Sequence, residues 1–578
     1  MIVRIDLATR RVSATQLESE RIHEGGRYLT SRIIAEEVPP TCHPLGRANK
    51  LVLACGALAG SLVSSVNRLS IGAKSPLTGG IKESNAGGTT GMAMGRLGIR
   101  ALILEGKTEA ALMQEHGARQ QEGWVVLHVR AGGIVFQSGD DLAGLGVYAK
   151  AEALRQRFGD KVAMTLVGPA GEWRMHTAGI TNADPEGVPS RYNGRGGLGA
   201  VMASKGVQAI VWDAEDCVRP IPADKAAFMA LNKEVGRRVN ATPQTAEVYR
   251  NYGTAATMAT TQSLGALPTH NFSRGRFDGF EQINGKRMHD IIKQRGGEGR
   301  TSHACMKGCL IQCSNIFPDA AGKSLCSPVE YENLGLLGSN LDIADLDSIA
   351  RINWLCNDLG CDTIEIGAAL GVAMDAGIFP FGDAGAVLET LEGLRQGTAF
   401  GRVIGAGAGV TGVVFGCQRV PTVKNQSMAA YDPRGLKGLG VTYATTTQGA
   451  DHTAGNVIRA AVKHHLKEGQ TEASRKAQHA FTLLDNMGIC IMLGAALGDM
   501  RILTDLIKAW HGCGPELAQL QAEAEQTLER ERQFNIRAGL SAAADSLPEF
   551  MTTERNPDSG AVFDFTPEEL RETLRFPE

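Results

Sequence analysis

The sequence predicts an α+β multidomain protein, in which a β-rich N-terminal domain is followed by two mainly helical domains. Three observations lead to this prediction. The chain has 578 residues, which is too long for one compact core, because domains usually contain one or two hundred residues. The first part of the chain reads as strands joined by glycine-rich turns. From about Ala223 onward, apolar residues recur with helical periodicity instead.

The domain boundaries are placed where this pattern changes. The predicted domains span residues 1–215, 216–420 and 421–578. The first boundary lies beside the segment RPIPADK, which begins at Arg219 and contains two prolines. A predicted loop at Val420–Arg434 begins at the second boundary.

Two hairpins and one buried strand are expected in the first domain. Met1–Gln16 and Trp124–Gln137 read as hairpins, and Val207–Trp212 (VQAIVW) reads as a buried strand. Three glycine-rich stretches lie among them, SPLTGGIKESNAGGTTG, MTLVGPAGE and RYNGRGGLGAVMASKG. The chain contains 71 glycines, which indicates tight turns and close backbone approaches, often to ligands. We see no internal repeat.

Helices are expected through the rest of the chain. Asp345–Leu359 has apolar residues at amphipathic spacing. Asp362 suits the N-cap of the next helix, with Glu365 three positions later as in a capping box. Glu389–Arg395 and Pro515–Arg537 also read as helical.

Composition excludes several classes of protein. The formal net charge is −3, so no basic surface indicates a nucleic-acid partner. No run approaches the ~18 apolar residues that a membrane helix needs. The start, MIVRIDLATRRV, alternates like a strand and has no apolar signal-peptide core. We therefore expect a cytoplasmic protein, without nucleic acid or membrane as partner.

A cysteine cluster is the strongest chemical signal. The chain has 12 cysteines, and in a long chain without an export signal these favour metal binding or redox chemistry over disulfides. HACMKGCLIQCSN places Cys305, Cys309 and Cys313 at equal spacing in a loop that contains Gly308. This pattern favours an iron–sulfur cluster completed by a distant fourth cysteine. The alternatives are a structural zinc site and buried inert cysteines, although zinc sites favour paired CxxC halves.

The fourth ligand stays open at this point, and its candidates are Cys326, Cys356, Cys361 and Cys490. Cys490 ends the segment DNMGIC, and the similar segment NDLGCD spans Asn357–Asp362. Two copies of the pattern [D/N]xxGx[C/D] suit two sites that bind the polar edge of a heterocycle. The alternative is two helix ends with C-caps at Gly360 and Gly488, each followed by an N-cap.

Eight ordered motifs, spread over nearly the whole chain, resemble those of the tungsten-dependent aldehyde:ferredoxin oxidoreductase family. The first four are EEVPP, PLGRANKLVLACGALAG, RLSIGAKSPLTGGIKESNAGG and LGIRALILEGK. The others follow in the family's order: GRGGLGAVMASKGVQAI, EYENLGLLGSN, CNDLGCDTIEIG and AYDPRGLKGLGVTYATTTQGADH.

The resemblance implies a tungsten or molybdenum atom held by two pterins, with a 4Fe–4S cluster beside it and a Mg²⁺ ion that links the pterins. It further implies that the β-rich domain is a pterin-binding base. The second domain would carry the three loop cysteines and the first pterin motif. The third would carry His452 and the second pterin and cluster motif, and the two helical domains would enclose the cofactor.

Site residues follow from the same resemblance. Glu332 and His452 match the residues nearest the metal, with Glu332 as acid/base and His452 as partner of the substrate oxygen. Asn85 and Tyr192 would serve the Mg²⁺, Tyr192 through its backbone carbonyl. The implied cluster ligands are Cys305, Cys309, Cys313 and Cys490. The implied cofactor-binding residues are Arg68, Asn85, Gly87, Arg191, Tyr192, Gly194, Asn357, Cys361, Asp362, Asp451, Asp485, Ile489 and Cys490.

Three positions depart from the family's pattern. The family commonly spaces its first two cluster cysteines as CxxC, whereas three residues separate Cys305 from Cys309 here, so Cys305 is the ligand most in need of testing. Asn357 stands where an aspartate is common, and Thr453 follows His452 where a basic residue is frequent. Asp432 and Arg434 of AYDPRG suit a structural role and a cofactor-lining role equally.

The resemblance therefore predicts an oxidoreductase that converts an aldehyde to a carboxylic acid and passes electrons through the cluster to a ferredoxin-like acceptor. It also implies a homodimer. One alternative is the same cofactor set acting on another carbonyl or an aryl thioester. The other is a non-redox, zinc-stabilised binding protein.

Overall fold

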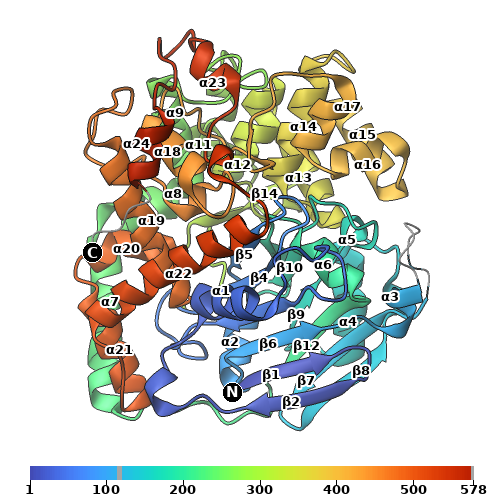
Figure 1. The fold of residues 1–578 in the computed structure, drawn as a ribbon, viewed down its shortest axis with the longest axis vertical. Helices are drawn as coiled ribbons and strands as arrows, with labels where there is room; N and C mark the ends of the chain where they lie inside the picture. The colour runs from blue at the N-terminus through green and yellow to red at the C-terminus, as the bar shows by residue number, and fades with distance from the viewer. Residues whose placement is uncertain (114–119, 121, 574–578) are drawn as a thin grey trace.

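The computed structural model describes residues 1–113, 120 and 122–573. It confirms the α+β class: the strands of the N-terminal part form a base, and the helical part of the chain covers it (Figure 1). The division of the helical part into two domains at residue 420 stays a prediction.

Two six-stranded sheets form the base. The first has the strand order β2-β1-β6-β3-β4-β5 and the second β11-β10-β9-β12-β7-β8. Their strands are β1 (Ile2–Asp6), β2 (Arg11–Thr15), β3 (Leu51–Cys55), β4 (Leu69–Lys74), β5 (Ile81–Ala86), β6 (Ala101–Glu105), β7 (Val125–Arg130), β8 (Gly133–Ser138), β9 (Ala163–Leu166), β10 (Ile180–Ala183), β11 (Pro189–Asn193) and β12 (Val207–Asp213). Both predicted hairpins, β1–β2 and β7–β8, and the buried strand β12 are confirmed.

The two sheets have the same topology, so the expectation of no internal repeat was wrong. In each half a hairpin's first strand runs parallel to the sixth strand, and the third, fourth and fifth strands follow antiparallel. Helices α2 (Thr90–Arg96) and α6 (Leu198–Ser204) take equivalent places before the sixth strand. The sequence signal is weak: Gly91 and Met94 of the first half correspond to Gly199 and Met202 of the second.

The two glycines have a structural cause. A Cβ on Gly91 would lie 2.4 Å from the carbonyl oxygen of Asn67, and one on Gly199 would lie 2.1 Å from that of Gly179. Each helix therefore packs directly on backbone of its own sheet. Asn193 joins the two sheets, because its side chain donates to the carbonyls of Leu69 (3.0 Å) and Ser84 (2.5 Å).

Helices make up most of the remaining chain, and those of at least seven residues have these bounds. The base carries α1 (Gly26–Glu37) and α4 (Val147–Phe158) in addition to α2 and α6. Beyond the base lie α7 (Lys225–Ala241), α9 (Thr257–Leu264), α11 (Gly285–Arg295), α13 (Leu346–Leu359), α14 (Thr363–Asp375), α15 (Ala384–Gln396), α16 (Ala399–Gly405), α17 (Ala408–Phe415), α18 (Lys437–Thr445), α19 (Gln470–Asn486), α20 (Ile491–Leu497), α21 (Arg501–His511), α22 (Leu517–Arg537) and α24 (Pro567–Thr573).

Shorter elements complete the helical part. The short helices are α3 (Glu109–Met113) and α5 (Pro169–Glu172) in the base, and α8 (Tyr249–Tyr252), α10 (Phe280–Ile283), α12 (Tyr331–Asn333) and α23 (Glu549–Thr553) beyond it. The small strands are β13 (Arg300–His303), β14 (Ser314–Pro318), β15 (Ser324–Cys326), β16 (Thr422–Val423) and β17 (Gln426–Ser427). The last two lie within the predicted loop Val420–Arg434.

The predicted helices are confirmed, with one correction. Helices α13, α14 and α22 match the predicted segments, and Glu389–Arg395 lies inside α15. Asp362 caps α14 by accepting from the backbone N–H of Ile364 (3.0 Å). Glu365 does not close a capping box, because it instead accepts from the backbone N–H groups of Ala408 (3.0 Å) and Ser427 (2.8 Å). Long-range contacts therefore overrode the local cap pattern.

The C-terminal ends of two helices of the helical part pack against the two halves of the base. The end of α19 meets the turn after β3, where a Cβ on Gly56 would lie 1.8 Å from the carbonyl oxygen of Met487. The end of α13 meets the turn after β9, where a Cβ on Gly168 would lie 2.3 Å from the carbonyl oxygen of Leu359. The two halves thus bind the two [D/N]xxGx[C/D] segments in equivalent ways.

Gly56→Ala is expected to destabilise the protein. The added methyl would collide with rigid backbone at Met487, and such overpacking costs about 1–3 kcal/mol or more. Thermal unfolding should therefore show a clearly lower Tm. Gly132→Ala is the matched control, because a Cβ there meets nothing within 4 Å. Equal Tm values for the two variants would contradict the close packing of α19 on the base.

One further result concerns membranes. Among the described residues, no single helix has the length and hydropathy of a membrane span, although α19 and α20, bent by 107°, pass that test as a pair.

Candidate functional site

The four cysteines that the family resemblance selects lie together where the helical part meets the base. The loop from Cys305 to Cys313 is fixed to the base by a hydrogen bond from the backbone N–H of Gly88 to the carbonyl of Cys305 (2.9 Å). Ser65 contacts two of the four: its hydroxyl lies 3.6 Å from the sulfur of Cys309, and its carbonyl accepts from the backbone N–H of Cys490 (2.9 Å).

Electrostatics shows the same grouping. A hydrogen bond with Cys309, followed by burial, raises the pKa of Cys305, and the same bond lowers the pKa of Cys309. Burial raises the pKa of Cys313, and the neighbouring Cys490 and Cys309 raise it further. Burial also raises the pKa of Cys490, Arg68 lowers it and Cys309 raises it. Four thiols so close together, with Arg68 and Arg191 nearby, form a donor set for a polynuclear cluster.

The other candidates for the fourth ligand lie elsewhere. The sulfur of Cys326 accepts from the side chains of Asn353 (3.2 Å) and Asn357 (3.8 Å) on α13. Cys356 and Cys361 neighbour each other at the end of that helix. Within the described part of the chain, no group of three or more His, Cys, Asp or Glu side chains is arranged to hold a single metal ion.

The first glycine-rich segment lies against the cysteine loop. Arg68 donates to the carbonyl of Asn85 (2.9 Å) and to its side-chain oxygen, and Asn85 donates to Ser70 (3.1 Å). A Cβ on Gly87 would lie 3.0 Å from the sulfur of Cys305. Glycine at this position therefore lets the loop approach the base closely.

Arg191, in the equivalent segment of the second half, keeps donors free. Its Nη1 donates to Ser314 (2.8 Å), whereas Nε and Nη2 are buried and make no hydrogen bond with the residues that the structure describes. A buried charged donor without an acceptor is costly, so this guanidinium suits a bound anion such as a phosphate. Tyr192 donates through its hydroxyl to the carbonyl of Asn357 (2.8 Å), and the backbone of Gly194 packs against Gly179.

The first [D/N]xxGx[C/D] segment is held by an arginine that the sequence prediction missed. Arg195 contacts Asp362 (3.2 Å) and donates to the carbonyls of Ser427 and Ala450 (2.6 Å each). It thereby ties the end of α13 to the loop before His452. Asn357 and Cys361, which precede Asp362 in the same segment, are both buried. The position of Arg195 directly after Gly194, in GRGGLG, was the available signal.

The second segment is held by a different arginine. Arg27 on α1 forms a buried ion pair with Glu531 on α22 (2.7 Å) and lies 3.7 Å from Asp485. Burial and the neighbouring Glu83 raise the pKa of Asp485. Ile489 is completely buried in the core beneath the cysteine loop. Arg27 was also missed, because only the fold brings it to Asp485.

Glu332 and His452 face each other. His452 Nε2 lies 3.5 Å from Glu332 Oε1, and Glu332 Oε2 accepts from the backbone N–H of Ala430 (2.7 Å). Glu332 Oε1 and His452 Nδ1 are buried and make no hydrogen bond with the described residues, although Nδ1 lies 3.9 Å from Asp451. The structure thus brings together these two residues, which the sequence places 120 positions apart, and leaves one polar atom of each without a hydrogen bond.

Asp451 anchors this pair to the base. Its carboxylate binds Lys82 of β5 (2.6 Å) and caps the backbone N–H of Thr453 (2.9 Å). Burial opposes the charge of Asp451, but Lys82, Arg195 and His452 together lower its pKa. Asp451 is therefore an anion that fixes the loop of His452. Lys82, in GIKESN, is a further residue that the sequence prediction missed.

Asp432 and Arg434 bind each other. Arg434 Nη2 lies 2.7 Å from Asp432, which also accepts from Asn556 (3.0 Å), and both residues are fully buried. These contacts favour the structural reading of the pair.

Two family models match the chain. "Aldehyde ferredoxin oxidoreductase, N-terminal domain" matches residues 2–214, and "Aldehyde ferredoxin oxidoreductase, domains 2 & 3" matches residues 230–575. The chain belongs to the aldehyde ferredoxin oxidoreductase family. It is therefore an oxidoreductase of this family, as the sequence predicted.

Relatives of known name extend this result. A "Tungsten-containing aldehyde ferredoxin oxidoreductase" of Pyrococcus furiosus is 29% identical, with 96% of this chain and 92% of the relative covered. A protein of the same name from Thermococcus kodakarensis is 28% identical over the same shares. An "Aliphatic sulfonate oxidoreductase, WOR-like subunit" of Pyrococcus furiosus is 22% identical, with 78% and 74% covered. The names of these relatives thus refer to different substrates.

A solved structure shares the fold. The active site complex BamBC of benzoyl coenzyme A reductase, in complex with 1,5-dienoyl-CoA, superposes with a TM-score of 0.80 at 17% identity. The match covers 99% of this chain and 92% of that chain. It supports the observed architecture of base and helical cover.

The residues present fit the cofactors of the family resemblance. Four grouped thiols suit a 4Fe–4S cluster. The free donors of Arg191 suit an anionic cofactor. The glycines that face the cysteine loop leave room that side chains would fill.

Proposed function

We propose that this protein oxidises an aldehyde to a carboxylic acid at a tungsten (or molybdenum) bis-pterin centre between the base and the helical part. The overall reaction consumes one aldehyde and one water and yields one carboxylic acid, two protons and two electrons. The observation that supports it best is the Glu332–His452 pair, in which two buried polar atoms make no hydrogen bond with the described residues. Asp451 ties the loop of His452 to the base.

Each group of residues has a part in the proposal. Arg68, Asn85, Gly87, Arg191, Tyr192 and Gly194 of the base, with the segments around Asn357, Cys361, Asp362, Asp485 and Ile489, would hold the two pterins and their Mg²⁺. Cys305, Cys309, Cys313 and Cys490 would hold the 4Fe–4S cluster. When bound, the metal centre supplies a two-electron oxidation and the cluster supplies one-electron steps to a ferredoxin-like acceptor.

The side chains of this chain do the proton chemistry. Glu332 is positioned to take a proton, because one carboxylate oxygen is fixed by Ala430, and the other faces His452 and makes no hydrogen bond with the described residues. His452 is positioned to donate a hydrogen bond to the aldehyde oxygen.

Metal analysis and an aldehyde assay test the proposal. Anaerobically purified protein should contain tungsten or molybdenum and about four irons per chain, and should reduce a viologen dye with an aldehyde as donor. An aryl-CoA ester should not replace the aldehyde as substrate; preference for it would support the thioester alternative. Active protein without tungsten or molybdenum would refute the proposal. The cytoplasmic location, the homodimer and the three-domain division belong to the same proposal.

A further inference from the structure

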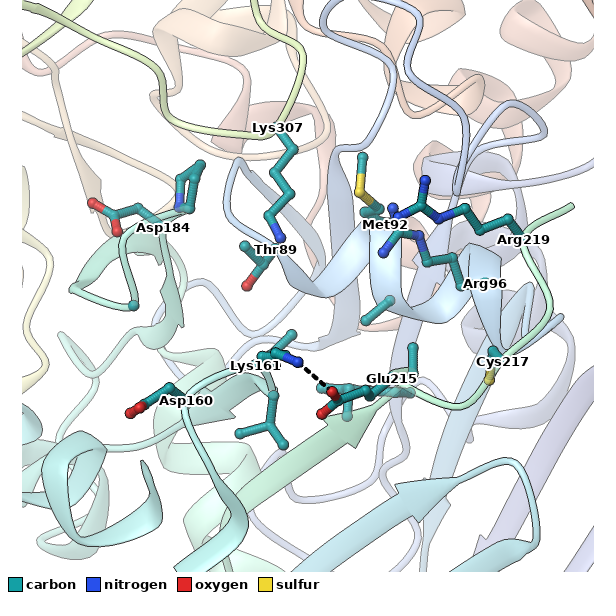
Figure 2. A pocket seen from close by; sticks show the side chains of 17 residues that line it. Thr89, Met92, Arg96, Asp160, Lys161, Asp184, Glu215, Cys217, Arg219 and Lys307 are labelled. Carbon is teal, nitrogen blue, oxygen red and sulfur yellow. Dashed lines mark hydrogen bonds and ion pairs between the residues drawn. The ribbon is translucent and has the colours of Figure 1, made fainter. Parts of the chain in front are cut away.

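A cavity of about 560 Å³ opens in the base beside the cysteine loop (Figure 2). It lies between α2, the start of β9, the end of β12 and Lys307 of the loop. In Figure 2 Lys307 extends toward Thr89, while Arg96 and Arg219 lie close together at another side.

The charges that line this cavity do not balance. Lys161 pairs with Glu215, and Asp184 pairs with His303 (3.1 Å). Arg96, Arg219 and Lys307 make no hydrogen bond or ion pair with described residues, and Arg96 Nε is buried without a partner. Asp160 is the remaining acid, and Figure 2 shows it at the opposite end of the cavity.

The two arginines are near enough to repel each other. Burial, and next the charge of Arg219, lower the pKa of Arg96. Like charges held together in this way are stabilised by an anion between them. The cavity is thus suited to receive carboxylates or phosphates from outside.

The cavity also adjoins the place where electrons would leave. Lys307 stands between Cys305 and Cys309, and Thr89 of the cavity wall follows Gly88, whose N–H binds the loop. Over the same loop, Leu62 is 59% exposed and Leu310 is 36% exposed. The backbone of Leu62 approaches the loop at Gly308, where a Cβ would lie 3.2 Å from the carbonyl oxygen of Leu62.

We propose that this face, which comprises Arg96, Arg219, Lys307, Leu62 and Leu310, docks an acidic electron-carrier protein whose carboxylates enter the cavity. The inference rests on the proposed function, because the carrier would take electrons from the cluster behind the loop. Exposed leucines favour a protein over a small phosphate ester, since a small anion would leave them uncovered. Each docked carrier would accept one electron, so two encounters would complete one aldehyde oxidation.

The double variant Arg96→Glu/Arg219→Glu tests this in the full-length, metal-loaded enzyme. With an acidic ferredoxin as acceptor at low salt, KM for the ferredoxin should rise about tenfold, because reversal of interface charges slows electrostatically steered association. Wild-type KM should rise with ionic strength, and that of the variant should not. Activity with methyl viologen, which needs no docking face, should stay unchanged.

The matched control is Arg287→Glu/Lys293→Glu on α11, in the helical part away from the base (Figure 1). An equal KM increase in this control, or an unchanged KM in the cavity variant, would overturn the docking face. Inorganic phosphate that inhibits viologen reduction, together with an unchanged ferredoxin KM in the cavity variant, would overturn the docking face. That result would instead indicate that the cavity binds a small anion. If the cavity variant loses stability, Arg96→Gln/Arg219→Gln should still show a smaller KM increase. Wild-type protein that fails to reduce viologen with an aldehyde would instead refute the proposed function, and this proposal with it.

Discussion

Glu332→Gln is expected to lower kcat for aldehyde oxidation by about 10³-fold, within the range that general base catalysis supplies. Glutamine retains an acceptor for the backbone N–H of Ala430 (2.7 Å), so the loop should keep its place. It cannot take a proton at neutral pH. Steady-state kinetics with a viologen acceptor measures the effect, and KM for the aldehyde should change little.

A comparison of stability and rate separates a chemical role from a structural one. Glu332→Gln should keep the Tm of the wild type, because glutamine retains the hydrogen bond with the backbone N–H of Ala430, while its kcat falls. Glu330→Gln is the control, because Glu330 caps α12 and bonds Thr254 without contacting His452. A Glu332→Gln enzyme with wild-type kcat would remove Glu332 from the mechanism.

Cys490→Ser is expected to lose cluster iron and nearly all activity. The proposed 4Fe–4S cluster needs four thiolates, and Cys490 is the distant cysteine that neighbours Cys309 and Cys313. The broad absorption near ~400 nm, which arises from thiolate-to-iron charge transfer, should collapse, and iron should fall well below that of the wild type.

Cys326→Ser provides the matched control, since Cys326 is also a buried free cysteine but bonds Asn353 instead. It should keep full iron and colour. Cys305→Ser should behave like Cys490→Ser, which would resolve the doubt that its unusual spacing raises. Loss of iron in Cys326→Ser but not in Cys490→Ser would contradict the proposed ligand set.

Local patterns predicted the elements of this fold well. Asp345 and Asp362 begin helices as expected, and both hairpins have the expected strands. These features depend on residues only a few positions apart. The predicted capping box at Glu365 was wrong, because its carboxylate accepts a hydrogen bond from the backbone N–H of Ser427, 62 positions later.

Long-range assembly was beyond the sequence pattern. The duplicated sheets share few identical residues, because strand pairing needs the alternation of side chains and not their identity. Arg27, Lys82 and Arg195 were missed for a related reason: a buried arginine or lysine is recognisable only when its distant acid is known. The resemblance to a family selected Glu332 and His452, which no local pattern would have linked.

The duplication of the base has a consequence for the direction of electron flow. The two equivalent segments end in different residues, Asp362 in one and Cys490 in the other, and each donates its backbone N–H to the equivalent half, to Thr177 (2.8 Å) and Ser65 (2.9 Å). Asp362 faces an arginine, whereas Cys490 faces the loop of thiols. The two halves of the base have the same topology, but the segments that they bind differ at their last position, which is Asp362 in one and Cys490 in the other. In the proposed enzyme, the 4Fe–4S cluster would lie on the side of Cys490, so electrons would leave the metal centre on that side.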